Sequence, residues 1–221
     1  MAGGEITAAG VGAGLGASVW VSWRKAGGRR ATLVVALALS ASGCSLTGGD
    51  KPPPTFDLSA PQAFPRAPRA PRGQLIVQDA TAVGVLDSDK IVVRPAEGKI
   101  AALADAQWGE RLTRLVQVRA IQAFENAKRM RAVGRPGDRF VADYQLLLDI
   151  RSFEIVVDGS SAEVTIAAKI VGDRSGRVVA GRVFTARVPA VATQGPPAIA
   201  ALDEAWGQVA SDIVLWASTV I

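Results

Sequence analysis

Apolar and polar side chains alternate along three long runs in the second half of the chain. These runs are Phe140 to Phe153, Ala162 to Val171 and Arg177 to Val188. A period of two is typical of strands that bury one face. The links between the runs, 158–161 and 172–176, consist mainly of turn-forming Asp, Gly and Ser. The pattern predicts three antiparallel strands in chain order, with one apolar face that needs a cover.

Two segments have the spacing of amphipathic helices. Between Glu110 and Ala127, apolar residues recur about every 3.6 positions, with no Gly or Pro among them. From about Pro197 to Val220, they recur at steps of three or four. The positions of this second stripe are Ile199, Leu202, Trp206, Val209, Ile213, Trp216 and Val220. We expect both helices to pack on the sheet, although the second stripe could instead bind a partner or a membrane.

Short β-type runs precede the first helix. They are Leu75 to Val77, Thr81 to Leu86, Lys90 to Arg94 and Lys99 to Leu103, separated by turn-forming residues. We interpret them as hairpins. Residues 74–221 are then predicted to form a single α+β domain, a mainly antiparallel sheet with two main helices packed on one face.

Residues 44–73 have a different composition and contain more than half of the prolines in the chain. Proline-rich chain is extended and semi-rigid, so we predict a solvated tether, with a possible short strand at Thr55 to Leu58. Three arginines, Arg66, Arg69 and Arg72, lie between the prolines and could contact anionic lipid headgroups or peptidoglycan.

The tether begins at Cys44, the only cysteine of the 221 residues. Four basic residues between Arg24 and Arg30, an apolar run from Leu33 to Leu39 and small residues up to Gly43 precede it. These are the parts of a secretory signal peptide, and the terminal cysteine makes it resemble a bacterial lipoprotein signal. We predict that residues 1–43 are a leader and signal peptide, that Cys44 is lipidated, and that 1–23 reflect a start assigned too early.

The composition of the chain excludes several kinds of catalytic and metal site. The chain has no histidine, which excludes a Ser-His-Asp or Cys-His nucleophile and the usual zinc ligand sets. We therefore predict no metal site, no cofactor and no enzymatic activity. The net charge of +5 falls to +2 without residues 1–43, because 21 basic and 19 acidic residues remain. No concentrated basic face is evident in the sequence of the domain, so nucleic acid is not an expected partner.

Several strings resemble one family in content and in order. They are Lys90 to Pro95, Ala104 to Trp108, the helix Arg111 to Ala127, and Asp143 to Glu154. They are similar to the ABC-type transport auxiliary lipoproteins, which include the lipoprotein partners of MCE-type lipid transport systems. The resemblance covers residues 44–220.

The resemblance implies a function and a place in the cell. It implies a lipid-anchored, periplasm-facing, non-enzymatic component of an envelope ABC transporter that moves lipid or another hydrophobic substrate. The ATPase, the permease and an MCE-type substrate-binding protein would be other chains, and a homo-oligomer is plausible. The residue after Cys44 is Ser45 and not Asp, which resembles the sorting signal of lipoproteins that are sent to the outer membrane.

Four residues of the domain and the tether are candidate partner contacts. Phe56 and Leu58 stand where family members often show paired tyrosines and a leucine. Trp108 could be an exposed aromatic anchor, since Trp is enriched at interface hot spots, or it could fill the seam between sheet and helix. Asp105 could contact the same partner or begin a short helical turn.

Other interpretations stay open. The protein could be a lipid- or ligand-binding carrier in its own right, or a structural lipoprotein that tethers peptidoglycan. Asp143, Asp149 and Glu154 could include a catalytic acid–base pair, although ordinary exposed acids are the commoner interpretation. A set of arginines could bind anionic lipid or simply be a solvated face: Arg111, Arg114, Arg119, Arg129 and Arg131.

Overall fold

The computed structural model describes residues 52–66, 71–96 and 98–221. Its strands and helices, in chain order, are β1 (Thr55–Phe56), β2 (Arg72–Val77), β3 (Thr81–Ala82), β4 (Lys90–Arg94), β5 (Ala101–Trp108), α2 (Leu112–Ala127), β6 (Met130–Gly134), β7 (Tyr144–Val156), β8 (Ser161–Gly172), β9 (Val178–Pro189) and α3 (Gly195–Val220). The strands form one mixed sheet, and the predicted α+β class is confirmed.

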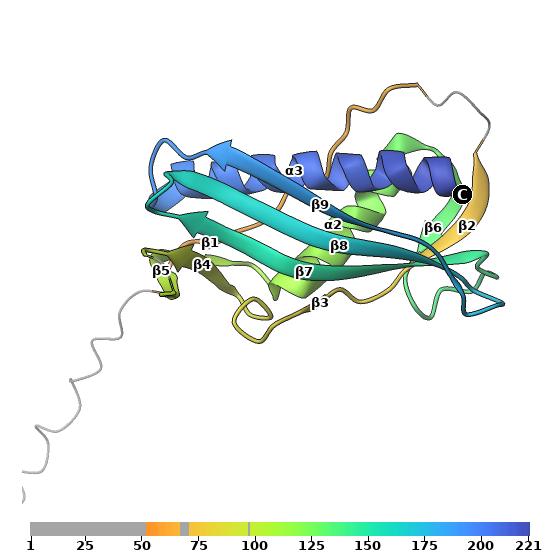
Figure 1. Cartoon of the computed structure of the whole chain (residues 1–221), viewed down its shortest axis with the longest axis horizontal. Coiled ribbons are helices and arrows are strands. Elements are labelled where there is room, and N and C mark those ends of the chain that lie inside the picture. Colours follow the sequence, from red (N-terminus) through yellow and green to blue (C-terminus); the bar gives the residue numbers. More distant parts are fainter. Residues whose placement is uncertain (1–51, 67–70, 97) are drawn as a thin grey trace, which may run out of the picture. The chain divides into compact units, whose positions relative to one another are not determined.

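β7 is the central strand of the sheet. On one side it pairs antiparallel with β8 over its whole length, from Tyr144 opposite Gly172 to Val156 opposite Ser161. β9 then pairs antiparallel with the far side of β8 (Figure 1). The period-two alternation therefore predicted these three strands and their order correctly, because each of them buries one face.

Along its other side, β7 pairs with three short strands that follow one another end to end. β2, β3 and β4 all run parallel to it. Of the predicted hairpins, only β4 with β5 is antiparallel, and the hairpin prediction for β2 and β3 is wrong. The reason is visible in Leu75 to Val77 and Ile91 to Val93, where every side chain is buried, as in strands covered on both faces.

A β-bulge in β7 explains why its alternation is imperfect. The register against β8 shifts between Ile150 and Ser152. One extra residue in a strand reverses the face to which the following side chains point. Ile150 and Phe153 therefore both face the core, each only 1% exposed, although they are three positions apart.

β6 was not predicted from the sequence. It pairs parallel with β2, and β2 lies between it and β7. Its sequence, Met-Arg-Ala-Val-Gly, has one long apolar side chain and a charge, which suits the end strand of a sheet and gives no clear alternation.

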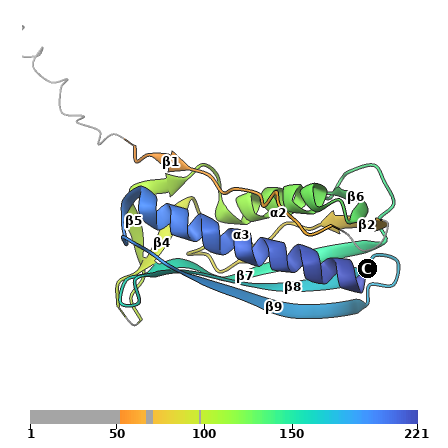
Figure 2. The same cartoon turned by 90° about the horizontal axis from the view of Figure 1, so that it is seen from above.

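Both helices cover the same face of the long strands. α3 packs against β8 and β9, α2 packs against β6 and β2, and the two helices contact each other (Figure 2). In α3 the predicted stripe points inward: Trp206 is fully buried, and the ring of Trp216 meets Phe184 of β9 edge to face at 5.4 Å. Packing on the sheet, the first of the two interpretations of this stripe, is confirmed. None of the helices described here is long and apolar enough to cross a membrane.

The pairings around β7 give the domain two distinct ends. β2 and β6 lie beside the beginning of β7, whereas β4 and β5 lie beside its last residues. β1 pairs with β5 and so belongs to the second end (Figure 1).

Candidate functional site: the N-terminal strap

Residues 52–66, which we call the strap, run along the domain and not away from it. β1 adds to the sheet in parallel with β5, with Thr55 opposite Gln107 and Phe56 opposite Trp108. The amide of Gln107 donates to the carbonyl of Pro54 at 3.0 Å, and the amide of Gly109 donates to the carbonyl of Phe56 at 2.7 Å. The first residues of the strap are therefore part of the sheet.

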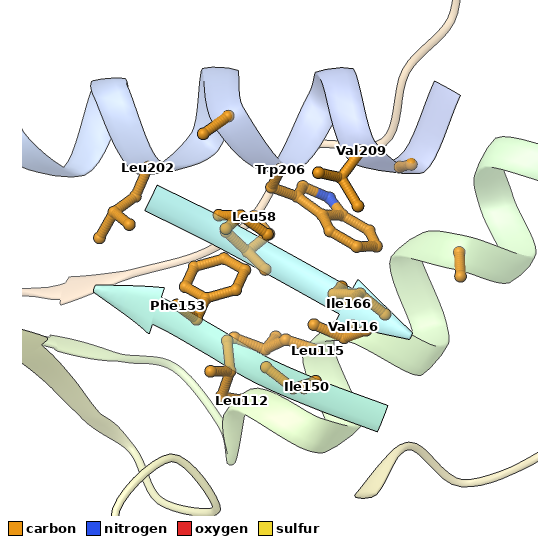
Figure 3. Packing of buried hydrophobic residues seen from close by; sticks show 14 of the residues in the cluster. Leu58, Leu112, Leu115, Val116, Ile150, Phe153, Ile166, Leu202, Trp206 and Val209 are labelled. Atoms are coloured by element: carbon orange, nitrogen blue, oxygen red, sulfur yellow. The ribbon is translucent and has the colours of Figure 1, made fainter. Parts of the chain in front are cut away.

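Leu58 fixes the strap in the hydrophobic core. Its side chain is 2% exposed and belongs to the main cluster of buried residues, beside Phe153 of β7 and Trp206 of α3 (Figure 3). Asp57 next to it accepts a hydrogen bond from the amide of Leu58 at 2.7 Å and forms an ion pair with Arg119 of α2. Burial of a leucine side chain is worth about 2 kcal/mol, so this contact is a strong anchor for a short segment.

Beyond Leu58, the strap is held by side chains of both helices. On the α3 side, the amide of Ser59 donates to Asp203 at 2.6 Å, and the indole N–H of Trp206 donates to the carbonyl of Ser59 at 2.9 Å. On the α2 side, Asn126 donates to the carbonyl of Pro61 at 2.9 Å.

Just after α2, Arg129 donates to the carbonyl of Pro65 at 2.7 Å. Proline has no N–H but keeps its carbonyl, so a proline-rich strap can be fastened wherever donors reach it. The strap therefore joins β5, α2 and α3.

This arrangement corrects the prediction of a solvated tether for the described residues 52–66. The segment is extended, as its prolines require, but it is bound to the domain. Residues 44–51 and 67–70 lie outside the described residues, and so does Cys44, whose lipidation stays a prediction.

Trp108 and Leu58 are not exposed contacts for a partner. Trp108 is 2% exposed, and its ring meets Phe153 edge to face at 5.9 Å. The aromatic pair fills the seam between sheet and helices, which was the alternative reading of Trp108. Leu58 is equally buried, so the predicted partner contact of both side chains is corrected to a role in the core.

Phe56 and Asp105 are accessible. Phe56 is half-buried at the edge of the cluster, and Asp105 is exposed on β5. Asp105 lies near Gly195, the first residue of α3. One of its carboxylate oxygens is 3.7 Å from the position that a Cβ on Gly195 would occupy. A carboxylate there interacts favourably with the helix dipole. The strap thus brings Phe56, Leu58 and Trp108 together, and Asp105 lies on the same strand as Trp108.

The carboxylates that could have formed an acid–base pair have separate partners. Glu154 receives two hydrogen bonds from Arg94, at 3.0 and 2.9 Å, and this contact raises the pKa of Arg94 above its usual value. Asp143 accepts the amide of Gln74 at 2.9 Å, and Asp149 lies 3.4 Å from Arg151. Each acid is used in a local contact.

Glu154 and Glu163 lie opposite each other on β7 and β8, and each is paired with an arginine on its outer side. Arg187 of β9 pairs with Glu163, and the hydrogen bond raises the pKa of Arg187. Like charges in direct register destabilise a sheet, so the two arginines offset this repulsion. We interpret the row as structural.

A groove of about 700 Å³ runs between the strap and α3. Its walls are Ser59 to Ala63 and the polar side of α3, which contributes Asp203, Glu204 and Asp212. The groove is open to solvent, and three carboxylates lie along its α3 wall. Among residues 52–66, 71–96 and 98–221, no group of three or more Cys, Asp or Glu is placed to hold a metal ion.

Comparison with known proteins identifies relatives. The family model described as "ABC-type transport auxiliary lipoprotein component" matches residues 56–214. The match begins at Phe56, so it includes most of the strap. A curated protein of Bradyrhizobium diazoefficiens, named "Uncharacterized protein bll6063", is 35% identical over 174 residues, which are 77% of this chain. The chain spans about half, 47%, of that relative's length.

Two solved structures share the fold. The protein XCC0632 from Xanthomonas campestris, assigned to DUF330, is 30% identical and superposes with a TM-score of 0.63, over 76% of this chain and 94% of that one. A second, described only as an uncharacterized protein, has a TM-score of 0.61 at 11% identity, over 76% of this chain and 99% of that one. The second shows the fold alone.

Proposed function

Because the chain belongs to the family of ABC-type transport auxiliary lipoprotein components, we propose that it serves an MCE-type lipid transport system as a lipid-anchored, non-enzymatic part. The family match over residues 56–214 carries the transport-associated assignment. To this assignment the proposal adds the MCE partners, the periplasm-facing position, the outer membrane and the lipid on Cys44.

The strap supports the proposed anchor mechanically. Eight residue steps separate Cys44 from Pro52, where the described chain begins. A fully extended chain advances at most about 3.6 Å per residue, so Pro52 can lie no more than about 29 Å from a lipid on Cys44. Because the strap is fastened to β5, α2 and α3, a force on the chain before Pro52 would act on the folded domain.

The proposed partners are an MCE-type substrate-binding protein and an ABC permease with its ATPase. We propose Asp105 and Phe56 as contacts, because they remain accessible beside the β1–β5 pairing while Trp108 and Leu58 are buried. A partner that docks there would lie close to the membrane in which the lipid is inserted.

Membrane attachment is tested with the parent chain and the Cys44→Ala variant in the native host. We expect the parent to fractionate with the outer membrane on a density gradient and the variant to leave it, with unchanged circular dichroism of the purified domain. A Cys44→Ala protein that still bands with the outer membrane would contradict the anchor.

Partner identity is tested separately by crosslinking the anchored parent in cells and identifying captured proteins by mass spectrometry. We expect an MCE-type protein and an ABC permease, and we expect Asp105→Asn to reduce their yield. Capture of a different class of ABC transporter would overturn the MCE assignment while leaving the family membership intact.

A further inference from the structure

Two adjacent loops lie at the end of the sheet opposite β1, an end that the last residues of the strap also approach. The β6–β7 loop covers 135–143 and the β8–β9 loop covers 173–177. The amide of Asp173 donates to the carbonyl of Asp143 at 3.0 Å, which joins the loops directly (Figure 1). The exposed residues that define this surface, which we call the basic tip, are Arg135, Arg139, Val141, Arg174, Arg177, Val178 and Val179.

The arginines of the basic tip lack the carboxylate partners that six of the eleven other described arginines have. Six arginines form ion pairs with carboxylates: Arg94, Arg111, Arg114, Arg119, Arg151 and Arg187. All six lie outside the two loops. Within the part of the chain that the structure describes, none of the four tip arginines has such a partner.

The aspartates of the two loops accept hydrogen bonds from backbone amides and from a neighbouring glutamine side chain. Asp138 accepts the amide of Arg135 at 2.9 Å, and Asp143 accepts the amide of Gln74 at 2.9 Å. Asp173 accepts a hydrogen bond from Gln145 at 2.6 Å. The acids nearest in the sequence therefore form no ion pairs with the guanidinium groups of the basic tip.

The neighbouring elements extend the positive surface. Arg72 begins β2 opposite Met130, and its amide donates to the carbonyl of Arg129 at 3.4 Å. Lys128 and Arg131 flank the same point and are exposed. The stretches 71–78 and 126–137 contain no acidic residue, so the cations outnumber the acids around this end of the sheet.

Exposed valines accompany the charges. Val141 is 65% exposed, Val178 is 61% exposed and Val179 is 49% exposed. Each follows an arginine within two positions, in Arg139-Phe140-Val141 and Arg177-Val178-Val179. Cations with adjacent apolar side chains on a projecting surface match the boundary between headgroups and acyl chains. The centres of protein interfaces are enriched in Trp, Tyr and Arg, whereas the exposed large apolar residues of the basic tip are valines.

We propose that the basic tip binds the anionic phospholipid headgroups of a bilayer, with the three valines entering the headgroup layer. The domain would then have a membrane contact at the end of the sheet opposite β1, in addition to any lipid on Cys44. This contact requires no transporter, so it stands or falls separately from the proposed function.

The test uses the predicted mature chain, residues 44–221, with Cys44→Ala, so that neither an acyl group nor the basic and apolar leader adds its own affinity, and measures flotation with vesicles. Phosphatidylcholine vesicles with and without phosphatidylglycerol are compared. The tip variant is Arg139→Gln with Arg177→Gln. The matched control, Lys90→Gln with Lys169→Gln, removes the same charge from exposed cations outside the tip. Thermal unfolding confirms that both variants fold.

We expect binding to anionic vesicles that weakens about 30-fold in the tip variant, on the order of fivefold per arginine, and much less in the control. High salt should abolish it, because screening shortens to about 3 Å at 1 M. A second variant, Val141→Ser with Val178→Ser, should reduce binding without changing charge. Equal loss in tip variant and control, or no loss in either, would overturn the proposal.

The remaining outcome concerns proteins. If the tip variant binds vesicles like the parent but loses self-association by light scattering, or loses a transporter partner in the crosslinking experiment, the tip is a protein-docking surface. That result would also overturn the lipid proposal.

Discussion

Leu58→Ala tests whether the strap is a separable unit of the fold. The substitution removes an isopropyl group from a site that is 2% exposed, between the sheet and α3. Buried leucine-to-alanine changes cost about 2–5 kcal/mol, and we expect about 3 kcal/mol because the neighbouring Phe153 and Trp206 are rigid rings that fill the gap poorly. The strap is otherwise held by β1 and a few hydrogen bonds worth about 1 kcal/mol each.

This loss should appear locally, because the strap can detach without opening the sheet. The amides of Gln107 and Gly109 donate to strap carbonyls, and so they report on its docking. We expect native-state hydrogen exchange at these two amides to accelerate about 100-fold, since 1.4 kcal/mol corresponds to a factor of ten. Amides in the centre of β8, such as Ile166, should keep their protection.

Leu147→Ala is the matched control. It makes the same chemical change on β7, but at a side chain that is 38% exposed, and surface changes usually cost less than about 0.5 kcal/mol. Equal acceleration of exchange in β8 and at the strap-bonded amides of Leu58→Ala would contradict a separable strap, because the strap would then unfold only with the whole domain. Parental exchange rates at Gln107 and Gly109 would also contradict the role of Leu58 as an anchor.

Two further predictions concern the strap and the charges. Trp206→Phe removes the N–H that donates to Ser59 and part of a fully buried ring, so the free energy of unfolding in urea should fall by about 2 kcal/mol; an unchanged value would contradict the contact. The melting temperature should vary by less than about 2 °C between about pH 6 and 8, because the chain has no histidine. The raised pKa values of Arg94 and Arg187 favour the folded state at every pH below the usual arginine pKa and lose this effect only above it. A melting temperature that shifts steeply in this window would reveal a titrating group that this reasoning omits.

The sequence predicted those elements whose burial pattern is local. β7, β8 and β9 each bury one face, and α3 buries one stripe, so their periodicities are visible without knowledge of neighbours. Strand partners are different. β2 and β4 are buried on both faces, and a continuous apolar run carries no information about direction. Their parallel pairing with β7 depends on how the chain is routed around α2.

The short strand predicted at Thr55 to Leu58 is present as β1, but the docking of the strap was missed because its composition is that of a linker. Proline removes donors, and few residues between 52 and 66 are apolar, so the segment has no period. A signal was present in Phe56, Leu58 and Phe64, isolated apolar residues that all lie on or in the core cluster. The other half of the contact is formed by Asp203, Asn126 and Arg129, which are distant in sequence and give no hint of a shared partner.

If Cys44 carries the proposed lipid, the strap connects that anchor to both helices. Arg119 and Asn126 hold it from α2, and Asp203 and Trp206 hold it from α3. A partner that binds the exposed side of α3 more tightly when the strap is docked must, by reciprocity, stabilise the docked strap by the same free energy. An effect of partner binding on the exchange of Gln107 and Gly109 would therefore measure how strongly the anchor and the partner are coupled, without any change in the sheet.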